Sequence, residues 1–78
     1  RSKEAYDLVI RALPYNEDNP ELLKTYISLC LDLHLSDYAE AGLAKLQPIT
    51  TPADYQAFRI TYQEKLASIE KSRQKFLQ

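Results

Sequence analysis

Few side chains in this sequence are of types that do chemistry, and they include one histidine and one cysteine. Histidine can act as a general acid or base near neutral pH, but His34 has no second histidine to work with. It stands near the expected end of a helix, where a histidine interacts favourably with the helix dipole. Cys30 lies in the most apolar segment, without a basic neighbour at helical spacing that would activate its thiol. We therefore expect a structural histidine, a small core cysteine and no enzyme activity.

Metal and cofactor chemistry also lack the residues that they need. A lone cysteine provides no disulfide framework, and no group of His, Cys and carboxylate residues has the spacing of metal ligands. With one glycine in 78 residues, the sequence has no glycine-rich loop that could cradle a phosphate. We expect no metal and no cofactor.

Six tyrosines and a basic stretch at 71–75 are the features that could suit a nucleic acid. However, Tyr26, Tyr55 and Tyr62 fall on expected core positions, and no basic stripe accompanies them. The formal net charge of −1 provides no overall attraction to phosphate. We do not expect nucleic acid as a partner, and weak phosphate contact by the 71–75 stretch is the alternative.

The bulk composition is that of a small globular domain, because 45% of the residues are apolar and 27% are charged. No apolar run approaches the roughly 20 residues that span a bilayer, and no signal-peptide pattern opens the sequence. Together with the single cysteine, this favours a cytoplasmic location without membrane contact. Because the sequence begins at Arg1 without an initiator Met, we expect 1–78 to be one domain from a longer protein.

Apolar residues recur at spacings of three and four, which predicts an all-α fold. The expected helices cover about 2–13, 20–35, 37–47 and 52–76. Asn19 followed by Pro20, and Thr51 followed by Pro52, are typical helix starts, through side-chain capping and the fixed φ of proline. Ser36 is expected to cap the third helix in the same way.

The sequence also repeats itself. Four residues of the first segment match four of the third at a displacement of 34: Ala5, Val9, Ala12 and Pro14 correspond to Ala39, Leu43, Leu46 and Pro48. The second and fourth segments match at a displacement of 32: Leu23, Tyr26 and Cys30 correspond to Tyr55, Phe58 and Tyr62. Alternating helices with a period near 34 resemble the tetratricopeptide repeat family, over residues 3 to about 66.

This resemblance implies a right-handed solenoid fragment of antiparallel helical hairpins. A long C-terminal helix is expected from the sequence itself, because no Gly or Pro follows Pro52. Ile27 and Arg59 depart from the family pattern, which has a small residue there, and His34 stands where glycine is common. A four-helix bundle without repeats is the alternative fold.

In tetratricopeptide arrays, alternate helices line a concave groove that binds peptides. The resemblance places the following residues on it: Glu21, Lys24, Ser28, Leu31, Asp32, Ala53, Gln56, Ile60, Gln63 and Glu64. The family's carboxylate clamp is not expected, since Lys24 fits its pattern but Ser28, Ala53 and Ala57 do not. We therefore expect a non-catalytic protein-interaction module that binds a protein or peptide partner, and an ordinary solvated face is the alternative.

The C-terminal helix offers a second function. Its apolar stripe extends beyond the partners that two hairpins provide: Tyr62, Leu66, Ile69 and Phe76. This stripe could cap the helix's own stack, which we favour, pair with a second copy, or join the rest of the protein. Lys65 and Ser72 interrupt a heptad and argue against a coiled coil. An accessory helical domain of a transcription regulator is a third hypothesis.

Overall fold

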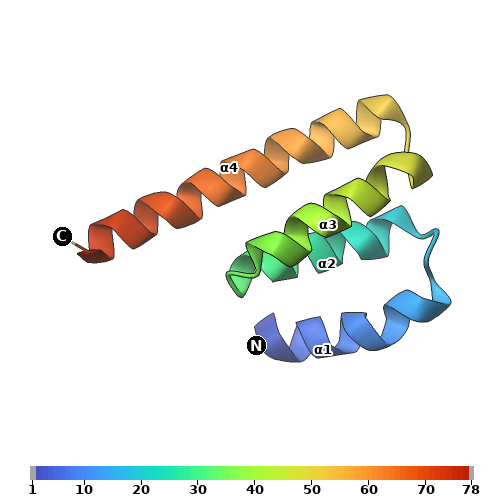
Figure 1. Cartoon of the computed structure of the whole chain (residues 1–78), viewed down its shortest axis with the longest axis horizontal. Coiled ribbons are helices and arrows are strands. Elements are labelled where there is room, and N and C mark those ends of the chain that lie inside the picture. Colours follow the sequence, from blue (N-terminus) through green and yellow to red (C-terminus); the bar gives the residue numbers. More distant parts are fainter. Residues whose placement is uncertain (1, 78) are drawn as a thin grey trace.

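A computed structural model describes the backbone of residues 2–77 and the side chains of residues 2–73. Its four α-helices are α1 (Ser2–Ala12), α2 (Pro20–Asp32), α3 (Ser36–Leu46) and α4 (Pro52–Leu77) (Figure 1). Short 3-10 turns, Leu13–Tyr15 and Gln47–Ile49, follow α1 and α3 and contain the two prolines expected to end these helices. No strand occurs between residues 2 and 77, which confirms the predicted all-α class.

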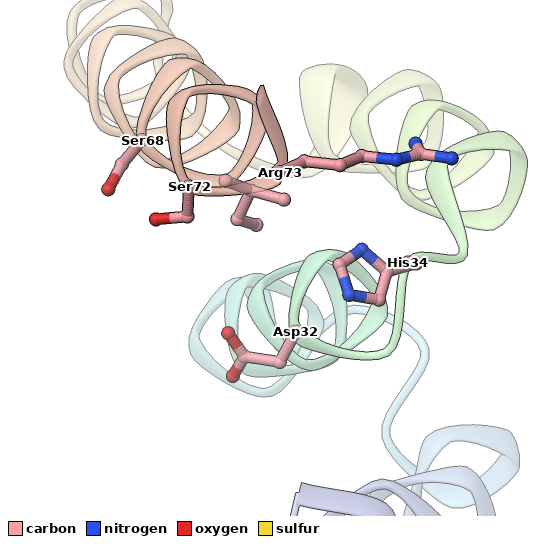
Figure 2. Close-up of a pocket in the computed structure, with 6 residues that line it drawn as sticks. Asp32, His34, Ser68, Ser72 and Arg73 are labelled. Atoms are coloured by element: carbon pink, nitrogen blue, oxygen red, sulfur yellow. The ribbon is translucent and has the colours of Figure 1, made fainter. Parts of the chain in front are cut away.

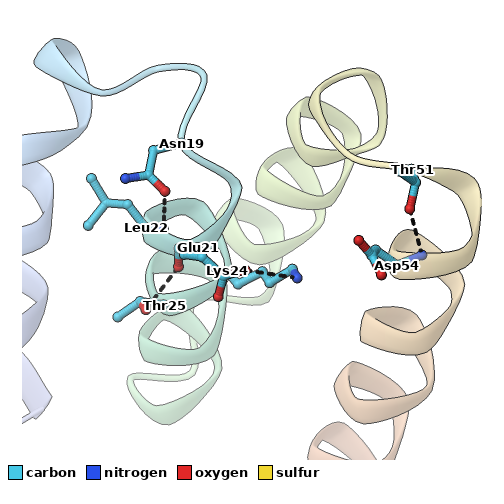
Figure 3. A network of polar contacts seen from close by, with 7 residues as sticks. All are labelled: Asn19, Glu21, Leu22, Lys24, Thr25, Thr51 and Asp54. Atoms are coloured by element: carbon cyan, nitrogen blue, oxygen red, sulfur yellow. Dashed lines mark hydrogen bonds and ion pairs between the residues drawn. The ribbon is translucent and has the colours of Figure 1, made fainter.

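The two helix starts marked by proline are capped as predicted. Oδ1 of Asn19 accepts a hydrogen bond from the backbone N–H of Leu22 at 3.2 Å (Figure 3). Likewise, Oγ1 of Thr51 accepts from the backbone N–H of Asp54 at 3.1 Å. Each bond satisfies one of the amide groups that a helix leaves without a partner at its start.

The connection between α2 and α3 differs from the prediction, because α2 ends at Asp32 and not near residue 35. The backbone N–H of Leu35 donates to the carbonyl of Cys30 at 2.7 Å, and that of His34 donates to Leu31 at 3.1 Å. His34 has φ of 61°, the left-handed conformation that commonly ends a helix in this bonding pattern. His34, which is not a glycine although glycine is common at such a position, therefore adopts the backbone conformation that ends α2.

The predicted cap of α3 by Ser36 is wrong. Leu35 occupies the capping position, and no side chain caps the start of this helix. The reason is the short connection: Leu35 completes the end of α2 and also accepts the first α3 hydrogen bond, from Ala39 N–H at 3.0 Å. Ser36 is therefore already inside the helix.

Helix α2 is the central element, since it packs against α1, α3 and α4. Its side chains Ile27 and Cys30, with Leu46 of α3, are the largest fully buried ones. The rings of Tyr6 and Tyr26 stack with centroids 5.8 Å apart and join α1 to α2. The core takes its members from all four helices: Val9, Leu23, Ile27, Cys30, Leu31, Ala39, Leu43, Leu46 and Tyr62.

Helix α4 is by far the longest helix, and its C-terminal part extends beyond the ends of α2 and α3 (Figure 1). At about 1.5 Å per residue its 26 residues span about 39 Å. Tyr62 is buried in its first half, and Leu66 and Ile69, just past its middle, are half-buried against the core. This part of the expected free stripe is therefore covered within the chain, and the Phe76 side chain lies outside the described residues. None of the helices, over the residues described, is long and apolar enough to cross a membrane.

Candidate interaction surfaces

The expected concave groove draws on α2 and α4, which do lie side by side. Nζ of Lys65 on α4 lies 2.9 Å from Oδ1 of Asp32 on α2. Nearer the start of α2, the Lys24 ammonium lies 6.0 Å from the centre of the Phe58 ring. These two contacts join the helices at both ends of α2, so the side of α2 that was expected to bind a partner is partly occupied by α4.

The expected groove residues of α4 point away from this seam. Ile60 is 59% exposed and precedes Ile69 by nine residues, or two and a half helical turns, so the two side chains project from opposite sides of α4. Ala53, Gln56, Gln63 and Glu64 are likewise exposed. The expected groove residues of α4 are therefore exposed, as a binding surface requires, and they lie on the side of the helix opposite Ile69 or beside it.

The expected exposure of Leu31 is wrong, because this side chain is only 3% exposed. Since α1, α3 and α4 surround α2, apolar residues are covered around most of its circumference. Ser28 is half-buried, and Lys24 keeps a quarter of its side chain exposed while its ammonium approaches Phe58.

The acidic bias of the expected groove is largely compensated. Glu21 pairs with Lys24 at 3.5 Å on the surface of α2 (Figure 3), and Asp32 pairs with Lys65. Glu64 takes part in neither ion pair. The seam between α2 and α4 is thus close to neutral.

An apolar groove that the sequence did not reveal lies between α1 and α3. It has a volume of about 690 Å³, and Leu23 and Tyr26 of α2 are among its lining residues. Ile10 of α1 and Tyr38 of α3 line it while remaining 40% and 57% exposed. One sequence feature could have pointed to this groove, because neither residue stands at a core-facing position of its helix.

A second cleft, of about 720 Å³, lies between the end of α2 and the C-terminal half of α4 (Figure 2). His34 and Arg73 line it, and Ser68 and Ser72 contribute hydroxyl groups from α4. Asp32 and Ile69 are the other lining residues. From the sequence, Arg73 stands out only as part of the basic stretch at 71–75, and nothing there connects it with His34.

Three titratable residues in or beside the core have pKa values above their ordinary ones. Burial raises the pKa of the Cys30 thiol above its ordinary value, which disfavours the reactive thiolate. Burial also raises the pKa of Tyr26, with a smaller contribution from a hydrogen bond with Cys30, and raises that of Tyr62. Tyr26 and Tyr55 pack half-buried against the core, as predicted. Among the described side chains, no group of three or more His, Cys, Asp or Glu residues could hold a metal ion.

No family model matches the chain, and neither a curated protein nor a solved structure matches it.

Proposed function

We propose that the chain is a non-catalytic protein-interaction module with a tetratricopeptide-like arrangement of helical hairpins. The contact between α2 and α4, made by Asp32 with Lys65, supports this arrangement. These helices are not consecutive, and stacked hairpins bring alternate helices into contact. An up-and-down four-helix bundle would place them diagonally across its core.

The binding surface that we propose is the groove between α1 and α3, in place of the expected concave groove. The observation that carries the proposal is its apolar lining, with Tyr38 57% exposed at its edge. Exposed aromatic side chains beside a pocket are typical of interface centres. The stacked rings of Tyr6 and Tyr26 hold one wall of the groove in place.

The partner that fits this groove is a peptide segment with an apolar anchor and polar neighbours. The volume of about 690 Å³ accommodates a large apolar side chain. Glu17 and Lys45 also line the groove and are exposed, so each can contact a polar group of opposite charge beside the anchor. Removal of Tyr38 and the partner's anchor from water supplies most of the binding energy.

Peptides selected from a displayed random library on the wild-type chain test the proposal, with affinities then measured by fluorescence polarisation. The variants Tyr38→Ser and Ile60→Ser form a matched pair, because the two side chains are 57% and 59% exposed on different surfaces. We expect Tyr38→Ser to weaken binding about tenfold or more, and Ile60→Ser to leave it unchanged. The opposite result would favour the concave groove, and failure to enrich any peptide would count against an interaction module.

Self-association through the apolar stripe of α4 is the competing function, and the residues of this stripe whose side chains are described offer it little exposed surface. Tyr62 is only 7% exposed, and Leu66 and Ile69 pack against the core of the same chain. Light scattering is therefore expected to give a mass near 9.0 kDa at all concentrations. A mass of twice that value, lost on Ile69→Ser, would instead make pairing of chains the function.

A further inference from the structure

The cleft between the end of α2 and α4 gathers hydrogen-bond donors from two parts of the chain. His34 comes from the turn after α2, while Ser68, Ser72 and Arg73 come from α4. Figure 2 shows the Arg73 side chain extending from α4 toward the end of the cleft where the imidazole of His34 lies, while the hydroxyls of Ser68 and Ser72 point in the opposite direction. The left-handed backbone at His34, with φ of 61°, sets the direction in which its side chain leaves the turn.

The positive charge of Arg73 is not balanced by another described residue of this cleft. Among the residues whose side chains are described, Asp32 is the only carboxylate that lines it, and its Oδ1 lies 2.9 Å from the Lys65 ammonium. Arg73 belongs to neither of the ion pairs formed among the described residues. Since Asp32 and Lys65 neutralise each other, the guanidinium is the uncompensated charge among the described residues of the cleft.

A guanidinium with neighbouring neutral donors suits a particular kind of ligand. Arginine binds a planar carboxylate through two parallel hydrogen bonds, and imidazole and hydroxyl groups can donate to the remaining lone pairs. One positive charge balances a single carboxylate, whereas a phosphoryl group with nearly two negative charges calls for further cations. The half-buried Ile69 adds an apolar contact for the carbon atoms next to the carboxylate.

We infer that this cleft is a carboxylate-binding site, in which Arg73 pairs with the ligand and His34 donates a further hydrogen bond. Its volume of about 720 Å³ admits either a small carboxylic acid or an acidic side chain of a protein. The site lies at the far end of α2 from the α1–α3 groove that the proposed function uses, so the two can be tested separately.

Amide chemical shifts from NMR titration of the 78-residue chain test the inference with four probes. These probes are acetate, inorganic phosphate, acetyl-Gly-Glu-Gly-amide and its glutamine counterpart. We expect acetate and the glutamate peptide to shift the signals of His34, Ser68, Ser72 and Arg73, and the glutamine peptide to leave them unchanged. If the glutamate peptide binds more tightly than acetate, the ligand is an acidic side chain of a protein. If the two bind equally, the ligand is a small carboxylic acid.

Three variants separate a specific site from general attraction to positive charge. Arg73→Gln should weaken binding of the glutamate peptide about tenfold or more. Lys71→Gln is the matched control, since it removes one exposed positive charge from the same helix and should change affinity less than about twofold. His34→Gly should weaken binding while the fold is kept, because glycine adopts the same left-handed backbone.

Several outcomes would overturn the inference. Equal losses in Arg73→Gln and Lys71→Gln would show attraction to net charge alone. Shifts of the same size with the glutamine peptide would show that no carboxylate is recognised. Tighter binding of phosphate than of acetate would assign the cleft to phosphoryl groups. None of these outcomes would affect the α1–α3 groove of the proposed function, which is tested separately with Tyr38→Ser.

Discussion

A Cβ atom on Gly42 would lie 2.7 Å from Cγ1 of Ile27, so the only glycine of the sequence lies where α3 packs closely against α2. Ile27 is fully buried. The missing side chain at Gly42 provides the space that Ile27 fills. A large residue on one helix is thus matched by the smallest residue on its neighbour.

Gly42→Ala is expected to destabilise the chain. The added methyl group would collide with the fully buried side chain of Ile27, at a cost of about 1–3 kcal/mol. Alanine gains up to about 1 kcal/mol over glycine inside a helix, which offsets only part of this cost. Urea unfolding followed by circular dichroism should therefore show a lower midpoint.

The same substitution in the Ile27→Ala background is the control. With the Ile27 side chain truncated, Gly42→Ala should be neutral or stabilising, because only the helix propensity remains. Ala44→Gly, at an exposed position of the same helix, measures that propensity separately and should cost about 0.5–1 kcal/mol. An equal loss from Gly42→Ala in both backgrounds would contradict the close contact.

Local signals and tertiary packing explain which features the sequence could predict. The starts of α2 and α4 were predictable because Asn19 and Thr51 cap helices through bonds to residues three positions later. The burial of Leu31 was not predictable from local signals, because it depends on how three other helices surround α2. The cleft of His34 and Arg73 joins residues far apart in the sequence, and nothing local links them.

His34→Gly is expected to raise the free energy of unfolding, by up to about 1 kcal/mol. A side chain in the left-handed region carries a steric cost of about 1–2 kcal/mol, which glycine avoids at the expense of greater freedom in the unfolded chain. His34→Ala keeps that steric cost and should be less stable than His34→Gly in urea unfolding. If the alanine variant were the more stable one, His34 would contribute to the fold through its side chain and not through its backbone alone.

Docking of α4 depends on Tyr62, which is 7% exposed. Tyr62→Ala is expected to cost about 3–5 kcal/mol, as for other large buried aromatic residues, and this is comparable with the stability of so small a domain. Ile60→Ala, two positions away on the exposed side of α4, should change stability by less than about 0.5 kcal/mol. Hydrogen exchange should show fast exchange along α4 in the tyrosine variant only. Similar exchange in both variants would contradict the docking of α4 through this side chain.

Stability should fall as the pH rises above about 9. Burial raises the pKa of Cys30 from 9.0, and it raises those of Tyr26 and Tyr62 from 10.0. When the pKa of a group is raised in the folded state, the unfolded chain loses that proton at a lower pH than the folded chain. The group's contribution to the free energy of unfolding is therefore complete below the unfolded pKa and is lost as the pH rises above it. Each such group should lower the free energy of unfolding by about 1.4 kcal/mol per pH unit in that range.

Urea unfolding between pH 8 and pH 11 measures this dependence, and Tyr26→Phe isolates one group. The phenylalanine variant cannot titrate there, so its stability should fall less steeply above pH 10 than that of the wild type. Tyr15→Phe is the matched control, because Tyr15 is 87% exposed and should leave the slope unchanged. Parallel curves for the wild type and Tyr26→Phe would mean that the Tyr26 hydroxyl ionises as readily in the folded chain as in water, which its half-buried position against the core argues against.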